Sequence, residues 1–156
     1  MDKQPSRGVS KLSPHLIVAG AAEAIKFYAQ AFGATEMIKL EGPDGKLMHA
    51  CLCINDSSVM LMDENRDFKA LSPKALGGSP VTIHLQVDDV DKTTAQAVAA
   101  GAKVVMPVAD MFWGDRYGIV EDPFGHQWSI ATTKRELSEA ELKEAARQAM
   151  CGEGIA

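Results

Sequence analysis

The chain has 156 residues, of which 46% are hydrophobic, so it is able to bury a core and is not a disordered chain. Acidic residues outnumber basic ones by 21 to 16, and the formal charge of −5 argues against a nucleic-acid partner, because phosphate binding needs clustered Lys and Arg. The polar N-terminus lacks the apolar segment of a secretory signal, and no apolar stretch is long enough for a bilayer, so we expect a cytoplasmic protein without a membrane partner.

The first half of the chain has the pattern of a βαβββ unit. A helix is indicated by Ile25, Tyr28 and Phe32 at helical spacing, followed by Gly33, a residue suited to a helix C-terminus. Alternating hydrophobicity and turn residues predict strands on both sides of it. In chain order we expect a strand at 13–18, the helix at 21–32, and strands at 36–41, 47–54 and 58–62.

The second half repeats this order after a segment that contains two Pro and two Gly. We expect a strand at 81–87, a helix at 90–100, and strands at 103–108, 116–121 and 127–132. Ser138 and Glu141 form a capping box, which predicts a further helix from Glu139 to about Met150 that packs on the body or on a partner. The chain is thus divided into an N-terminal tail, a first module, a linker, a second module, and a C-terminal helix with its tail, at residues 1–11, 12–66, 67–80, 81–133 and 134–156.

The two halves are also similar in sequence. His15-Leu16-Ile17-Val18 resembles His84-Leu85-Gln86-Val87, and each segment is followed by a helical stretch that ends in Gly-Ala. The interval from His to Gly is 18 residues in the first half and 17 in the second. The shared order of elements and the shared spacing together indicate an internal repeat.

Two longer motifs resemble those of a known family. They are the Phe27-Tyr28…Ala31-Phe32-Gly33-Ala34 run, and the run from Trp113 to Trp128 that contains Asp122-Pro123-Phe124-Gly125. With the duplicated unit, they resemble the PhnB-like branch of the vicinal oxygen chelate superfamily, which includes glyoxalase I, fosfomycin and bleomycin resistance proteins and extradiol dioxygenases. The resemblance implies an α+β fold with eight strands curled into a cup, usually in a homodimer, but no single reaction.

Catalytic members of this family hold a divalent metal, and the resemblance locates the corresponding positions. Two of them lie five residues before Val18 and Val87, and the third lies seven residues after Asp122. Neutral hydroxyls occupy all three, at Ser13, Thr82 and Ser129. Because Ser and Thr are poor ligands for divalent ions, we expect neither the standard metal triad nor a cofactor.

Histidines near these positions leave an alternative open. His15 and His84 lie two residues beyond the nominal ligand positions, so each is expected on the same side of its strand as that position. His49 is a third candidate from another strand. These three side chains form either a displaced divalent-metal site or polar groups that hydrogen-bond a ligand, and no carboxylate accompanies them at a suitable strand position.

Other residues are expected on the inner face of the cup. By strand alternation Gln86 and Ser129 share this face with the histidines, and Met60 and Met62 line the cavity or fill gaps in the core. Cys51 and Cys53 are expected to be reduced thiols without activation.

The loop from Met111 to Tyr117 contains large apolar side chains. Phe112 and Trp113 form either an aromatic lip over the ligand or a dimer contact. Arg116 either donates hydrogen bonds to an anion or carbonyl of the ligand, or forms a salt bridge with Asp115 or Glu121.

The sequence therefore predicts a protein that binds a small organic molecule in its cup, with His15, His84, Gln86, Phe112, Trp113, Arg116, Ser129, Met60 and Met62 as the candidate ligand-binding residues. Two other functions remain open. One is a metal-dependent lyase, isomerase or transferase that uses His15 and His84, and the other is a resistance protein that sequesters an antibiotic.

Overall fold

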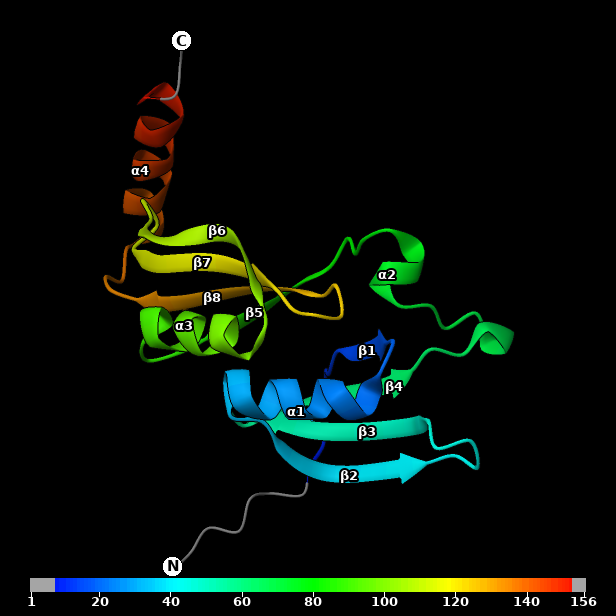
Figure 1. The fold of residues 1–156 in the computed structure, drawn as a ribbon. Coiled ribbons are helices and arrows are strands. Elements are labelled where there is room, and N and C mark those ends of the chain that lie inside the picture. The colour runs from blue at the N-terminus through cyan, green and yellow to red at the C-terminus, as the bar shows by residue number, and fades with distance from the viewer. Residues whose placement is uncertain (1–7, 153–156) are drawn as a thin grey trace, which may run out of the picture.

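The structure is a computed structural model that describes residues 8–152. The first seven residues of the expected N-terminal tail and the last four of the expected C-terminal tail lie outside this range. Within it, the chain folds into two βαβββ units, each with a four-stranded mixed sheet, followed by a C-terminal helix (Figure 1). The α+β fold expected from the repeat is confirmed, and within one chain its eight strands form two separate sheets.

The first sheet has the strand order β1-β4-β3-β2. Strand β1 pairs in parallel with β4, and the other neighbours are antiparallel. Helix α1 begins after β1 and ends at Gly33, whose φ of 67° is the left-handed conformation that glycine adopts at low cost. The elements of this unit are β1 (His15–Val18), α1 (Ala21–Phe32), β2 (Thr35–Glu41), β3 (Leu47–Ile54) and β4 (Ser57–Asp63).

The second sheet repeats this topology in the order β5-β8-β7-β6. Asp89 caps the N-terminus of its helix, because the Asp89 carboxylate accepts a hydrogen bond from the backbone N–H of Lys92 at 3.0 Å. The segment before β5 contains two short helices, η1 (Arg66–Phe68) and α2 (Pro73–Leu76). The elements of this unit are β5 (Thr82–Gln86), α3 (Val90–Ala100), β6 (Lys103–Asp110), β7 (Asp115–Glu121) and β8 (Gln127–Thr133).

One hydrophobic core joins the two units. In Figure 1, α3 and α1 lie one above the other, with β6, β7 and β8 above them and β3 and β2 below. Strand residues of both sheets that face these helices belong to a single cluster of buried side chains. At its centre, Trp128 of β8 contacts Tyr28 and Phe32 of α1, with ring centroids 5.4 and 4.7 Å apart. The sequence repeat therefore produces two units that share a core.

The C-terminal helix α4 (Glu139–Gly152) projects away from both sheets in Figure 1. Its capping box forms as expected, since the backbone N–H of Ser138 donates to Glu141 at 2.7 Å. None of its described side chains is buried, so within the single chain α4 does not pack on the body. Packing on a partner stays a prediction. Across residues 8–152, no helix combines the length and apolar character needed to cross a membrane.

Candidate functional site on the open faces of the two sheets

The two helices cover only one side of each sheet. Successive strand residues point to opposite sides, so every second side chain points away from the shared core. We call these two surfaces the open faces. The first sheet has His15 and Ile17 on its open face, next to Met60 and Met62, which pair with them across β1 and β4. The second sheet has His84 and Gln86 there, next to Ser129 and Ala131 of β8.

A chain of hydrogen bonds fixes the polar groups on the second open face. The amide nitrogen of Gln86 donates to the hydroxyl of Thr133 at 2.7 Å, which leaves its carbonyl oxygen 3.0 Å from Nε2 of His84. With Gln86 in this orientation its carbonyl oxygen accepts, and His84 donates from Nε2. Nδ1 of His84 lies 2.8 Å from the hydroxyl of Ser129. Hydrogen bonds to both ring nitrogens therefore fix the orientation of the His84 ring.

Aromatic rings continue this face beyond His84. The ring of Tyr117 is stacked on His84 with centroids 6.2 Å apart, and Trp113 contacts Tyr117 edge to face at 5.3 Å. The indole N–H of Trp113 donates to Asp115 at 3.1 Å, which orients the ring. Phe112 packs against Trp113 and remains exposed. The second open face thus combines a polar centre with an aromatic border, as ligand sites commonly do.

Arg116 does not share this face with His84. Its guanidinium forms a two-point contact with Asp91 of α3, at 2.7 and 2.9 Å, and a third bond with Asp110 at 3.2 Å. These contacts place Arg116 on the helix side of β7. The salt bridge that Arg116 forms is therefore with Asp91 and Asp110 and not with the expected Asp115 or Glu121. The Arg116 guanidinium lowers the pKa of the Asp91 carboxyl, chiefly through hydrogen bonding. Arg116 also lines a hollow of about 570 Å³ with Lys134 and Arg135.

Two histidines approach each other on the first open face. The rings of His15 and His49 meet edge to face with centroids 5.7 Å apart. Partial burial, and then the neighbouring His49, lower the pKa of His15 below its usual value of 6.5. His84 lies in the other sheet, hydrogen-bonded to Ser129 and Gln86, so a single chain brings together His15 and His49 but leaves His84 apart from them.

The positions of the family metal ligands do not fit a divalent ion. Ser13 contacts the hydroxyl of Ser58 and also lies 3.4 Å from the backbone oxygen of Ser10, while Ser129 is buried against His84. Thr82 begins β5 and is exposed. Three neutral hydroxyls offer no imidazole, carboxylate or thiolate donor. Among the described residues, no three His, Cys, Asp or Glu side chains converge in an arrangement suited to a metal ion.

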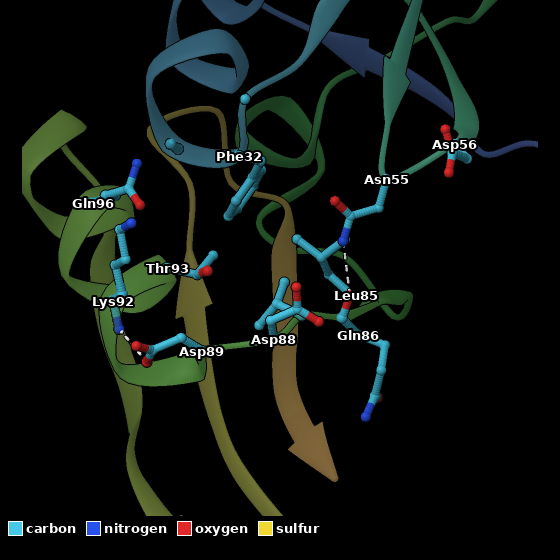
Figure 2. Close-up of a pocket in the computed structure, with 13 residues that line it drawn as sticks. Phe32, Asn55, Asp56, Leu85, Gln86, Asp88, Asp89, Lys92, Thr93 and Gln96 are labelled. Atoms are coloured by element: carbon cyan, nitrogen blue, oxygen red, sulfur yellow. Dashed lines mark hydrogen bonds between the residues drawn. The ribbon is translucent and has the colours of Figure 1, made fainter. Parts of the chain in front are cut away.

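A separate groove of about 500 Å³ lies where the two units meet (Figure 2). Its lining includes Phe32 at the end of α1 and Lys92 on α3. Along one wall, the side chain of Asn55 donates a hydrogen bond of 2.8 Å to the backbone oxygen of Gln86, which links the first unit to the second. Figure 2 shows the side chain of Gln86 pointing away from the groove, so the groove and the second open face are distinct surfaces.

Comparison with known proteins places this geometry in a family. A family model described as the Glyoxalase/Bleomycin resistance protein/Dioxygenase superfamily matches residues 12–130. The chain therefore belongs to this superfamily, and the resemblance inferred from its sequence motifs is confirmed.

Individual proteins are similar to this chain in sequence or in fold. "Uncharacterized protein Rv0887c" of Mycobacterium tuberculosis (strain ATCC 25618 / H37Rv) is 52% identical over 137 residues, which cover 86% of this chain and 81% of that protein. The crystal structure of protein PA1353 from Pseudomonas aeruginosa has a TM-score of 0.66 at 27% identity, over 80% of this chain and 98% of that one. The PhnB protein from Bacillus cereus shares the fold, with a TM-score of 0.62 at 18% identity over 80% of this chain and all of that one (100%).

Sequence reasoning missed one residue of this face and one of the core. Tyr117 lies against His84, and alternation along 116–121 assigns it only to the same side of its strand as Ile119, because the contact depends on how β7 and β5 pair with β8. Asp122 reads in the sequence only as part of a tight turn. It is buried and accepts hydrogen bonds from both Tyr28 and Trp128, a role that no local pattern indicates.

Proposed function

We propose that this chain binds a small organic molecule on the open face of its second sheet, in a cup that a second copy of the chain completes. The observation that carries the proposal is the network of Ser129, His84 and Gln86 beside the rings of Tyr117 and Trp113. Hydrogen-bonding groups fixed in one orientation next to an aromatic border are suited to orienting a ligand. Phe112 extends the apolar wall, and Met60 and Met62 belong to the opposite wall of the cup.

The homodimer is supported by the distribution of apolar side chains. Strand β2 has Ile38 and Leu40 paired with Cys51 and His49, which places both on the first open face, where they are 46% and 49% exposed. Apolar groups gathered on an uncovered sheet face favour association, because burial removes them from water. In the assembly that we propose, the first open face of one chain lies opposite the second open face of the other.

The ligand's polar group follows from the hydrogen-bonding capacity that Gln86 retains. Its bonds to Thr133 and His84 leave a second amide hydrogen and a second carbonyl lone pair, so the face suits a carbonyl or hydroxyl group. The aromatic border suits a planar apolar body. We therefore propose a planar ligand that has a carbonyl or hydroxyl substituent. Arg116 takes no part in this proposal, because Asp91 and Asp110 occupy its donors.

The proposal is tested with a panel of small aromatic aldehydes, ketones and phenols. Compounds that raise the melting temperature of the protein are then titrated while tryptophan fluorescence is recorded. Trp113 borders the site and Trp128 is buried in the core, so the Trp113→Phe variant should lose the fluorescence response. A response that persists unchanged in Trp113→Phe, or a panel in which no compound stabilises the protein, would contradict the proposal.

Recovery of the bound compound decides between binding and catalysis. A ligand that returns unchanged after incubation supports a sequestering role, including that of an antibiotic-resistance protein. A converted ligand supports an enzyme. The alternative of a metal-dependent enzyme on His15 and His84 is tested by elemental analysis of protein that was purified without chelators or metal-affinity resin.

A further inference from the structure

The first open face is rich in sulfur and imidazole. Met60 and Met62 of β4 lie beside Cys51 and His49 of β3, and His15 of β1 pairs with Met60 on the other side. None of these side chains belongs to the family's nominal ligand positions. At the positions that correspond to Met60 and Cys51, the second open face has Ser129 and Ile119. The two open faces therefore carry different donor groups.

Strand order determines where the two histidine rings meet. Strand β4 lies between β1 and β3, so His15 and His49 belong to the strands on either side of it. Their ring centroids are 5.7 Å apart, which brings both rings over β4. The side chains of β4 on this face are Met60 and Met62. Two imidazoles therefore approach each other across the strand that carries the two thioethers.

The chemistry of these donors selects a class of ion. Thioether sulfur is a soft, neutral ligand that binds Cu(I) and related monovalent ions, whereas divalent ions such as Mg²⁺ and Zn²⁺ prefer oxygen, nitrogen or thiolate. The thiol of Cys51 contacts the sulfur of Met37 at 3.9 Å, and its pKa is raised, first by burial and then by Cys53. Apart from this thiol, the donors on the face are the imidazoles of His15 and His49 and the thioethers of Met60 and Met62.

We propose that His15, His49, Met60 and Met62 form a binding site for a soft monovalent metal ion, Cu(I) or its analogue Ag(I). Neutral donors suit a singly charged ion, because they leave little net charge to be desolvated in the site. The site lies within one chain and needs neither the dimer nor the organic ligand. The metal site therefore goes beyond the proposed function, and a test of the metal site and a test of organic-ligand binding have independent outcomes.

The test measures binding of Ag(I) and Cu(I) to full-length protein in which Cys51, Cys53 and Cys151 are replaced by Ala, so that free thiols do not contribute. Competition with a chromophoric Cu(I) chelator should give one ion per chain. The His49→Ala variant and the Met60→Leu, Met62→Leu double variant should each weaken binding by at least about tenfold, as loss of groups at a metal site does. Zn²⁺ should bind far more weakly than Cu(I).

Matched controls test whether binding depends on the first open face. Met150→Leu removes an exposed thioether of α4 and should leave binding unchanged. Loss of binding in His84→Ala would assign the metal to a site shared with the second sheet and overturn the proposal. Equal binding of Zn²⁺ and Cu(I), or Cu(I) affinity that is unaffected by the Met60 and Met62 changes, would overturn it as well.

A second measurement observes the thioethers directly. In the same cysteine-free protein labelled with ¹³C at the methionine methyl groups, Ag(I) should shift the signals of Met60 and Met62 and leave that of Met150 in place. If Ag(I) shifts neither signal at one equivalent per chain, the thioethers are not ligands and the proposal fails.

Discussion

The hydroxyl of Tyr28 in α1 donates a hydrogen bond of 2.6 Å to the carboxylate of Asp122, which lies in the turn between β7 and β8. Both residues are buried, and the same carboxylate accepts bonds from the indole of Trp128 and from the backbone N–H groups of Phe124 and His126. Burial, followed by the negative charge of Asp122, raises the pKa of Tyr28 well above its usual value. One carboxylate thus connects the helix of the first unit to the second sheet.

Replacement of either partner should destabilise the whole protein. Tyr28→Phe removes one donor from a buried carboxylate, and we expect a loss of about 1.5–3 kcal/mol in the free energy of unfolding. Asp122→Asn should cost more, because its NH₂ group faces at least one of the four donors. Urea denaturation followed by circular dichroism measures both. Equal stability of Asp122→Asn and wild type would show that the carboxylate does not join the units.

Removal of the His84 ring should weaken ligand binding and leave metal content unchanged. Loss of one hydrogen bond is worth about 0.5–1.5 kcal/mol, so the dissociation constant of a compound identified in the panel should rise about threefold to tenfold in His84→Ala. The fluorescence of Trp113 reports the affinity. His126→Ala is the comparison, because His126 contacts the backbone oxygen of Ile17 and is not on the second open face. An unchanged affinity in His84→Ala would exclude this ring from the site.

The protein should be a homodimer in solution. One chain has a mass of 16.7 kDa, and light scattering at micromolar concentration is expected to give twice that mass. Ile38→Ser combined with Leu40→Ser should shift the equilibrium toward monomer, because the apolar area buried at the interface decreases. Leu76→Ser removes a similarly exposed apolar side chain from α2 and should not. A monomeric wild-type mass would contradict the proposed assembly.

Replacement of Arg116 should affect stability more than ligand binding. Its bonds to Asp91 and Asp110 are partly exposed, so Arg116→Ala should lower the free energy of unfolding only slightly. Ligand affinity should remain within error of the wild-type value, since the guanidinium lies on the helix side of β7. A large loss of affinity without a loss of stability would instead place Arg116 in the ligand site. That result would favour the alternative in which Arg116 donates hydrogen bonds to the ligand.

Acidification should destabilise the first sheet through His15. The pKa of His15 is lower in the folded protein than the usual 6.5, so folding favours the neutral ring. The contribution of the neutral His15 ring to the free energy of unfolding is fully present above about pH 6.5. It is lost as the pH falls through the folded pKa, because the unfolded chain then binds the proton more tightly. The melting temperature should fall between about pH 7.5 and pH 5.5, and fall less in His15→Gln. An identical fall in both proteins would assign the effect to other groups.

The sequence alone determined the strands of this fold, the helices α1, α3 and α4, and their order, whereas η1 and α2 lie where only a linker was expected. Helical spacing and the glycine at Gly33 give α1 its bounds, and the period-two pattern separates His84 and Gln86 from the buried Leu85. These features are local, since a few neighbouring residues decide helix, strand or turn. The family was also recognised from the sequence, because the two motifs that indicate it are continuous along the chain.

The tertiary structure alone decided which side chains meet. The pairing of His15 with His49 depends on β4 lying between their strands, and the contact of Arg116 with Asp91 depends on α3 covering β7. Tyr28 and Asp122 are 94 residues apart in the chain. Such contacts result from how two sheets and two helices share one core, and this arrangement is set by packing among distant residues, which no local pattern contains.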